Sequence, residues 1–186
     1  LEEKGSYLSG IQSAGKHLNI NVQHVSFEQT NNPMDGEFCS GGTGIGNALF
    51  PDVFPCANLF ISMIGSHRGE LGGSQYLSLI NQENTGTQPV VDLLMESRLQ
   101  ETILTGIQGG LIQSARAVGA GGIAVSIAKS FGKNAQLGAR IHFSRKLKID
   151  ELLFGETQGL VIVTIKETDL MEFERVCMTI GIPATT

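Results

Sequence analysis

The sequence is poor in aromatic and basic residues. It has no tryptophan and two tyrosines among 186 residues, and its 13 Lys and Arg face 18 Asp and Glu for a formal net charge of -5. The basic residues occur singly, apart from the short cluster Arg145, Lys146 and Lys148. Proteins that bind nucleic acid concentrate basic side chains on one face, because phosphate contacts supply most of the affinity. The composition therefore argues against a nucleic-acid partner.

Long apolar runs, a leader sequence and paired cysteines are missing as well. No stretch approaches the roughly 20 apolar residues that cross a bilayer, and the segment from Leu1 to Lys4 lacks the order of a secretory signal. Cys39, Cys56 and Cys177 are widely spaced, which predicts neither a disulfide framework nor a zinc site. We expect a cytoplasmic protein with no membrane partner.

Glycine, by contrast, is abundant. The 24 glycines gather at 41–46, 72–73, 109–110 and 119–122 without a fixed period. Clusters between apolar segments indicate tight strand-to-helix turns, where the backbone takes positive φ or approaches a ligand. The first cluster lacks a phosphate-loop signature, because Asn47 and Ala48 stand where Lys and Ser or Thr are required, and we interpret it as a flexible loop.

Hydrophobic periodicity predicts helices alternating with strands. Helices are expected over Glu2–Leu18, from Ser74, over Asp92–Ile107, Ile123–Phe131 and Ile149–Phe154, and from Asp169 onward. Strands are expected over Ile20–Phe27, Leu59–Ile64, Leu111–Val118, Ala139–Phe143 and Leu160–Ile165. Ser74, Asp92 and Asp169 are the expected helix N-caps. The order predicts an α/β or α+β fold, with a mixed sheet packed with helices.

Two of the glycine turns are candidate anion sites. The turn at 72–74 and the turn at 119–122 each precede a helix, so their backbone N–H groups point toward a possible anion. A plain strand-to-helix turn with a serine cap explains the first equally well. Two such turns in one sheet could also converge on a single phosphate. Glu156, between an apolar turn and a strand, could hold a metal or stabilise its turn, and we favour the structural role.

Taken in order, four stretches resemble one family. They are Asn21–Phe27, Arg68–Leu77, Pro89–Val125 and Leu152–Gly159. The second is close to Gly-Glu-Leu-Gly-Gly-Ser-Glu-Tyr-Leu, and the fourth to Leu-Phe-Ser/Gly-Glu-Ser-Gln-Gly. These motifs are similar to those of the synthase that converts formylglycinamide ribonucleotide to its amidine, a member of the aminoimidazole ribonucleotide synthetase superfamily.

The resemblance implies a position within that enzyme. Residues 1–30 look like the tail of an ATP-binding-type amino-terminal domain, 31–50 like a loop or linker, and 51–186 like the carboxy-terminal domain of the synthetase. The amino-terminal half, which carries the family's catalytic histidine and most nucleotide-binding residues, is not in the sequence. We therefore expect the chain alone to be inactive and monomeric.

The resemblance also implies a reaction and its partners. In the family, ATP with magnesium phosphorylates the substrate amide oxygen, and ammonia from a glutaminase domain or subunit displaces the phosphate. The implied partners are the amino-terminal half, the glutaminase and the ribonucleotide. The expected phosphate-binding residues, with Glu156 and Gln158 forming the floor of the site, are Gly72, Gly73, Ser74, Arg116, Gly121 and Gly122. No catalytic residue or metal ligand is assigned to this chain.

Departures from the family pattern leave a second hypothesis open. Where the family has Ser-Ala-His-Asp-Val-Ser-Asp-Gly-Gly, this chain has Arg116 for the histidine and Ala117 and Ala120 for the two aspartates. Carboxylates hold magnesium against phosphate, so metal-dependent work at this turn is in doubt. A non-catalytic scaffold domain of the same superfamily is the alternative. Selenophosphate synthetase, thiamine-phosphate kinase and hydrogenase-maturation factors, elsewhere in the superfamily, fit the second and fourth motifs less well.

Overall fold

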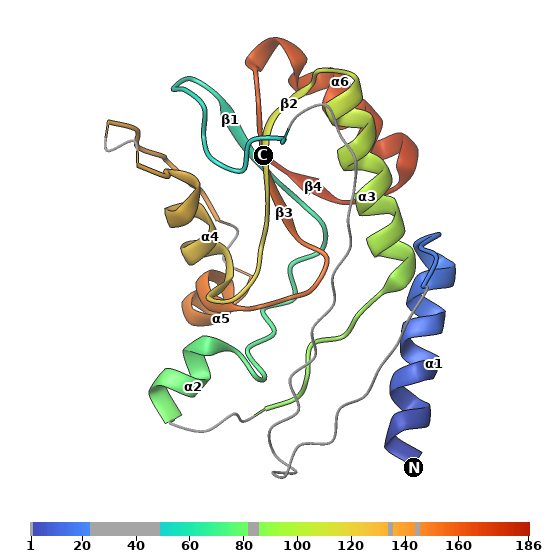
Figure 1. Ribbon diagram of the computed structural model, residues 1–186. Coiled ribbons are helices and arrows are strands. Elements are labelled where there is room, and N and C mark those ends of the chain that lie inside the picture. The colour runs from blue at the N-terminus through green and yellow to red at the C-terminus, as the bar shows by residue number, and fades with distance from the viewer. Residues whose placement is uncertain (1, 23–48, 82–85, 134–135, 144–145) are drawn as a thin grey trace. The chain divides into compact units, whose positions relative to one another are not determined.

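A computed structural model of the protein describes residues 2–22, 49–81, 86–133, 136–143 and 146–186 (Figure 1). The chain divides into two units, Leu1–Leu49 and Phe50–Thr186. In the first unit, α1 (Glu2–His17) confirms the predicted helix, and Asn19 ends it in a left-handed conformation with φ 53°. Ile20, Asn21 and Val22 have no regular structure, and the rest of the strand expected over Ile20–Phe27 lies outside the described residues.

The second unit is built on a four-stranded sheet in the order β2-β3-β1-β4. Its strands are β1 (Phe60–Ile64), β2 (Ile112–Ala117), β3 (Val161–Ile165) and β4 (Ala184–Thr185). Each of these pairings is antiparallel, with Val161 opposite both Ile64 and Ala117. The α+β class is confirmed, and the described sheet is antiparallel rather than mixed. Two-residue β4 is too short to produce a periodic signal, so the sequence did not predict it.

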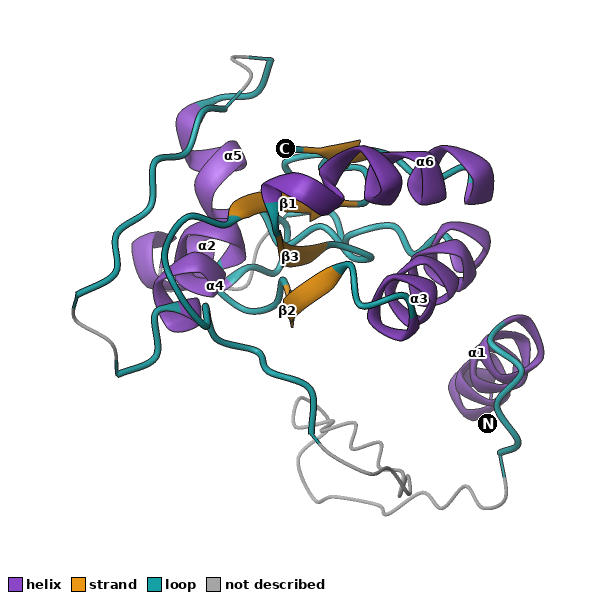
Figure 2. Ribbon diagram, turned by 90° about the horizontal axis from the view of Figure 1, so that it is seen from above, coloured by secondary structure: helices purple, strands orange, loops and turns teal. Residues whose placement is uncertain are grey.

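Helices cover both faces of this sheet (Figure 2). The helices are α2 (Gln75–Asn81), α3 (Leu93–Gln108), α4 (Gly122–Ser130), α5 (Ile149–Phe154) and α6 (Leu170–Ile180), the last preceded by the 3-10 turn Glu167–Asp169. Figure 2 shows α3 and α6 on one side of the strands and α2, α4 and α5 on the other. None of the helices in the described parts of the chain is long and apolar enough to cross a membrane.

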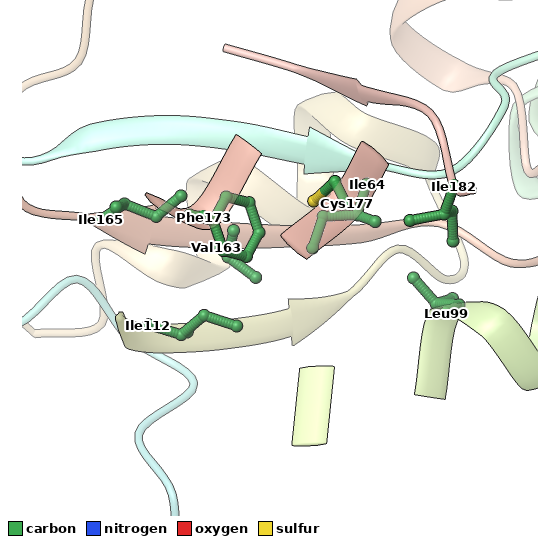
Figure 3. Packing of buried hydrophobic residues seen from close by; sticks show 8 residues of the cluster. All are labelled: Ile64, Leu99, Ile112, Val163, Ile165, Phe173, Cys177 and Ile182. Atoms are coloured by element: carbon green, nitrogen blue, oxygen red, sulfur yellow. The ribbon is translucent and has the colours of Figure 1, made fainter. Parts of the chain in front are cut away.

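Each face of the sheet has its own apolar core. The larger one, shown in Figure 3, joins the sheet to α3 and α6 and consists of Ile64, Leu99, Ile112, Val163, Ile165, Phe173, Cys177 and Ile182. Burial raises the pKa of the Cys177 thiol to about 11, so this cysteine is a protonated core residue at neutral pH. On the other face, Phe54, Ile123 and Ile162 form a smaller core, where the rings of Phe54 and Phe131 meet edge to face at 5.3 Å.

Two of the three expected caps are confirmed. Asp92 Oδ1 accepts hydrogen bonds from the N–H groups of Leu94 and Met95, both at 3.1 Å, and Ser74 Oγ accepts one from the Leu77 N–H at 3.2 Å. Asp169 occupies the expected N-cap position of α6, but its side chain makes no capping hydrogen bond. That residue has helical backbone angles at the end of the 3-10 turn, and its carboxylate accepts from the Thr168 hydroxyl instead.

The strand expected over Ala139–Phe143 is also wrong, because this segment has no regular structure. Its neighbour Leu137 and its last residue, Phe143, pack against the smaller core, whereas Ile141 is 36% exposed. Side-chain packing rather than a ladder of backbone hydrogen bonds therefore holds the segment.

Candidate functional site

The two glycine turns meet at the carboxylate of Glu156. Its Oε1 accepts a hydrogen bond from the N–H of Gln75, the first residue of α2, at 2.8 Å, and another from the N–H of Gly121, the residue before α4, at 2.9 Å. The Glu156 N–H donates to the carbonyl of Glu70 at 2.8 Å. The turns thus converge as the sequence suggested, and the anion between them is supplied by the protein.

Close backbone approach explains two of the predicted glycines. A Cβ on Gly72 would lie 1.7 Å from the carbonyl oxygen of Thr87. A Cβ on Gly122 would lie 2.8 Å from the carbonyl oxygens of Leu153 and Gly155, at the end of α5, and Gly122 also has φ +67°. Distances this short are incompatible with a side chain, so packing alone requires glycine at both positions.

Gly73 is different. It has φ +69°, and no described atom lies within 4 Å of the place where its Cβ would be. Its neighbour Ser74 is fully buried and caps α2. The turn at 72–74 is therefore anchored on both sides of Gly73 while Gly73 itself faces open space. At this point a ligand could approach the backbone.

A polar network joins this turn to the segment before α3. Arg68 Nε donates to Glu70 Oε2 at 3.1 Å, and Glu70 Oε1 accepts from the Val90 N–H at 2.9 Å. The buried hydroxyl of Thr157 accepts from the N–H groups of Arg68 and Glu70, at 3.2 and 3.4 Å. Burial opposes ionisation of Glu70, but the hydrogen bonds from Val90, Thr157 and Arg68 outweigh it and lower its pKa.

The members of this network do not stand out as functional candidates in the sequence. Arg68 and Glu70 lie inside the second matched motif, and Thr157 lies inside the fourth, so position within the motifs was the available signal. The motifs do not reveal that the buried hydroxyl of Thr157, in the fourth motif, accepts hydrogen bonds from two backbone N–H groups of the second motif. That contact depends on the folded turns.

Gln158 lies at the rim of the same region. Its side chain is exposed, and Nε2 donates to the Glu156 carbonyl at 3.2 Å. With Arg68, Asp92 and Glu96 it lines a small pocket at the start of α3. The structure therefore brings Glu156 and both glycine turns together, whereas Gln158 faces the pocket at the start of α3.

Arg116 has a different partner. It lies on β2, and its guanidinium donates from Nε to the Asp52 carbonyl at 2.9 Å and from Nη2 to Asp52 Oδ2 at 2.7 Å. The N–H of Ala115 donates to the carbonyl of Pro51 at 2.9 Å. Arg116 therefore fastens the segment before β1 to the edge of the sheet, and a role in phosphate binding would require this pair to open.

We expect the Arg116–Asp52 pair to contribute little stability. The Asp52 side chain is 64% exposed, and exposed ion pairs are typically worth about 0.5 kcal/mol. A double-mutant cycle with Arg116→Met and Asp52→Asn, followed by urea unfolding, should give a coupling energy of about 0.5 to 1 kcal/mol. A coupling near zero would mean that the pair does not hold the segment in solution.

Neither the histidines nor the acidic residues form a metal centre in the described chain. No three His, Cys, Asp or Glu residues of that part lie together in a way that could hold an ion. His67, which the sequence left as a surface or satisfied residue, is half-buried between the carbonyl of Leu152, 2.9 Å from Nε2, and the N–H of Gly69, 3.5 Å from Nδ1. It links the loop after β1 to α5.

The fold and site define an α+β domain with helices on both faces of an antiparallel sheet and two glycine turns tied by one carboxylate. Residues 60–185 match the family described as AIR synthase related protein, C-terminal domain. The chain belongs to this family. The same fold occurs in the solved structure of Thermotoga maritima PurL complexed with FGAR, with TM-score 0.60 and 20% identity over 74% of this chain and 25% of that one.

Curated relatives confirm the resemblance to phosphoribosylformylglycinamidine synthase. The chain is 37% identical over 118 residues to subunit PurL of Alkaliphilus metalliredigens, a match that covers 63% of this chain and 16% of the relative. It is 31% identical over 140 residues to PurL of Anaeromyxobacter sp. (strain K), covering 70% and 18%. The chain thus spans less than a fifth of the length of these relatives.

Proposed function

We propose that the chain is the carboxy-terminal portion of an ATP-dependent ligase that converts formylglycinamide ribonucleotide to formylglycinamidine ribonucleotide in purine biosynthesis, and that it is incomplete alone. The similarity to PurL subunits over less than a fifth of their length supports both parts. In the whole enzyme, an amino-terminal half would supply the catalytic residues, and a glutaminase domain or subunit would supply ammonia.

The observation that carries this proposal is the open backbone at Gly73. The turn at 72–74 is fixed by Ser74 and by the approach of Gly72 to Thr87, and it presents Gly73 to open space at the start of α2. We assign Gly72 and Gly73 to the phosphate of the ribonucleotide. Ser74, which the sequence placed with them, would hold the turn instead, because its N–H already donates to the Leu71 carbonyl at 3.0 Å. Gly121 and Gly122 would support the site from α4, and Glu156 with Gln158 would form its floor.

Magnesium does not fit the residues at the second turn. Ala117 and Ala120 stand at the family's carboxylate positions, and Glu156 Oε1 already accepts two backbone N–H groups. Magnesium and ATP would therefore be held by the rest of the parent enzyme and not by this turn. The contribution of this chain is to hold phosphate with backbone donors, which needs no metal.

Gly73→Ala tests the assignment, and Gly110→Ala is its matched control. Gly110 has φ +70° and, like Gly73, no described atom within 4 Å of a Cβ position, so both substitutions should lower the free energy of unfolding by about 1 kcal/mol. Only Gly73→Ala should reduce the rise in melting temperature that formylglycinamide ribonucleotide causes, because a ligand that binds the native state stabilises it.

A second candidate function is a non-catalytic scaffold that binds nothing itself. The engagement of Arg116 by Asp52 favours it, as do the alanines at 117 and 120. If millimolar ribonucleotide leaves the melting temperature of the wild-type chain unchanged, the scaffold reading replaces the phosphate site. An equal ligand response in wild type and Gly73→Ala would remove Gly73 from the site.

A further inference from the structure

Glu156 makes hydrogen bonds to two separate segments of the chain, the one that runs from the loop after β1 into α2 and the turn before α4. Its backbone N–H reaches Glu70 in the loop after β1, while its carboxylate reaches Gln75 and Gly121. Gln75 is 81 residues away in sequence and Gly121 is 35 residues away. One side chain therefore joins the start of α2 to the turn before α4.

Each turn also has its own neighbour. Gly72 lies against the backbone of Thr87, whereas Gly122 lies against the end of α5. The backbone at 153–156 also lies against both segments, because a Cβ on Gly155 would be 3.0 Å from Gly69 and the Glu156 N–H donates to the Glu70 carbonyl. These backbone contacts bring the segments together, and the Glu156 oxygen then sets the spacing of the two N–H groups, at 2.8 Å from one backbone nitrogen and 2.9 Å from the other.

A carboxylate suits this place for an electrostatic reason. Both partners are backbone N–H donors, and hydrogen bonds to an ionised acceptor are roughly twice as strong as neutral ones. The side chain of Glu156 is half-buried and its bond from Gly121 is partly buried, so solvent screens that bond less than the exposed bond from Gln75. The oxygen of an amide of the same shape would accept hydrogen bonds from the same two N–H groups, but these bonds would be weaker because the amide carries no charge.

We propose that Glu156 is a positioning residue whose carboxylate sets the distance between the two glycine turns and thereby the placement of the Gly73 backbone. The consequence for ligand binding rests on the proposed function, but the consequence for the turns does not. The geometry also identifies a substitute. Glu156→Ala removes everything beyond Cβ, and the removed atoms correspond to acetate, which can accept the same two N–H bonds.

The test uses the whole 186-residue chain with Glu156→Ala. We expect its melting temperature to fall by about 5 °C, from the loss of two charge-assisted hydrogen bonds in a chain of this size. Sodium acetate at about 100 mM should restore at least half of that loss, whereas sodium chloride at the same concentration should not. Glu174→Ala, which removes a half-buried carboxylate on α6 away from both turns, should show no acetate response.

Nuclear magnetic resonance gives a readout that general destabilisation would not move. In Glu156→Ala, the amide proton signals of Gln75 and Gly121 should shift upfield because their hydrogen bonds are lost, and acetate should return them toward their wild-type positions. Absence of acetate rescue in both melting temperature and these two signals would overturn the inference.

Ligand measurements separate this inference from the proposed function. If the ribonucleotide raises the wild-type melting temperature, Glu156→Ala should lose most of that response and regain it in acetate. If Glu156→Ala keeps the full response, the positioning role is refuted and the proposed function is not. If the wild type shows no ligand response, the proposed function fails, and acetate rescue of the turns still decides the role of Glu156.

Glu156→Gln keeps the test decisive if the alanine variant does not fold. Its amide oxygen preserves the shape but not the charge, so we expect a smaller fall in melting temperature and upfield shifts of the Gln75 and Gly121 amides. A variant with wild-type stability and wild-type amide positions would contradict the proposal.

Discussion

Phe173→Ala is expected to lower the free energy of unfolding by about 4 kcal/mol, the range for removing a buried phenylalanine. Phe173 is 0% exposed on α6, and its ring lies against the buried Gly106 of α3, where a Cβ would be 3.5 Å from it. The ring therefore fills the contact between the two helices and β3, as Figure 3 shows in part. Urea unfolding followed by circular dichroism measures the loss.

Met171→Ala is the control for this substitution. Met171 lies on the same helix but is 83% exposed, so its removal should change the free energy of unfolding by less than about 0.5 kcal/mol. Equal effects of the two substitutions would mean that α6 does not pack through Phe173. The contrast thus tests the orientation of the helix as well as the size of the core.

Gly122→Ala is expected to cost about 3 kcal/mol and to disturb the site. Two effects add: a left-handed backbone costs a residue with a side chain about 1 to 2 kcal/mol, and forcing a methyl group into a packed space costs another 1 to 3 kcal/mol. The atoms it would meet are backbone carbonyls of Leu153 and Gly155, which cannot rotate away as a side chain can. Urea unfolding gives the stability, and ligand-dependent thermal shift gives the effect on the turns.

Gly110→Ala separates the two effects here as well. It shares the positive φ but meets no described atom, so it should cost only about 1 kcal/mol. If Gly122→Ala and Gly110→Ala lower the free energy of unfolding equally, then α4 does not approach α5 as closely as the structure shows. A larger loss at Gly122 confirms that glycine is needed there for packing between helices.

The sequence predicted most of the regular elements because their signals are local. Asp92 is followed by a 16-residue amphipathic helix that glycines end, and α3 begins and ends as expected. The strand expected over Ala139–Phe143 is absent, because Phe143 packs against the smaller core through its side chain while Ile141 is 36% exposed. The sheet order and its antiparallel pairing depend on contacts between distant segments, which periodicity does not encode.

The candidate site was predictable in its composition but not in its connections. Glycine turns and Glu156 stood out in the sequence, and the structure brings them together. Arg116 was expected at the same place from its position beside a glycine turn, yet the carboxylate of Asp52, 64 residues away, binds it. The fold decides which partner a charged side chain takes. Arg116 binds Asp52, which lies in a segment where the sequence predicts neither a helix nor a strand.

The position of β3 has a consequence for synthesis of the chain. β3 lies between β1 and β2, although it follows both in the sequence, so neither earlier strand has its main partner until residues 161–165 have been made. Until then, Ile64 and Ile112 cannot be covered by the strand that buries them in the finished sheet. A chain that lacks residues 161–165 therefore leaves the apolar residues of both strands without their covering strand, and incompletely folded chains with such exposed surface tend to aggregate.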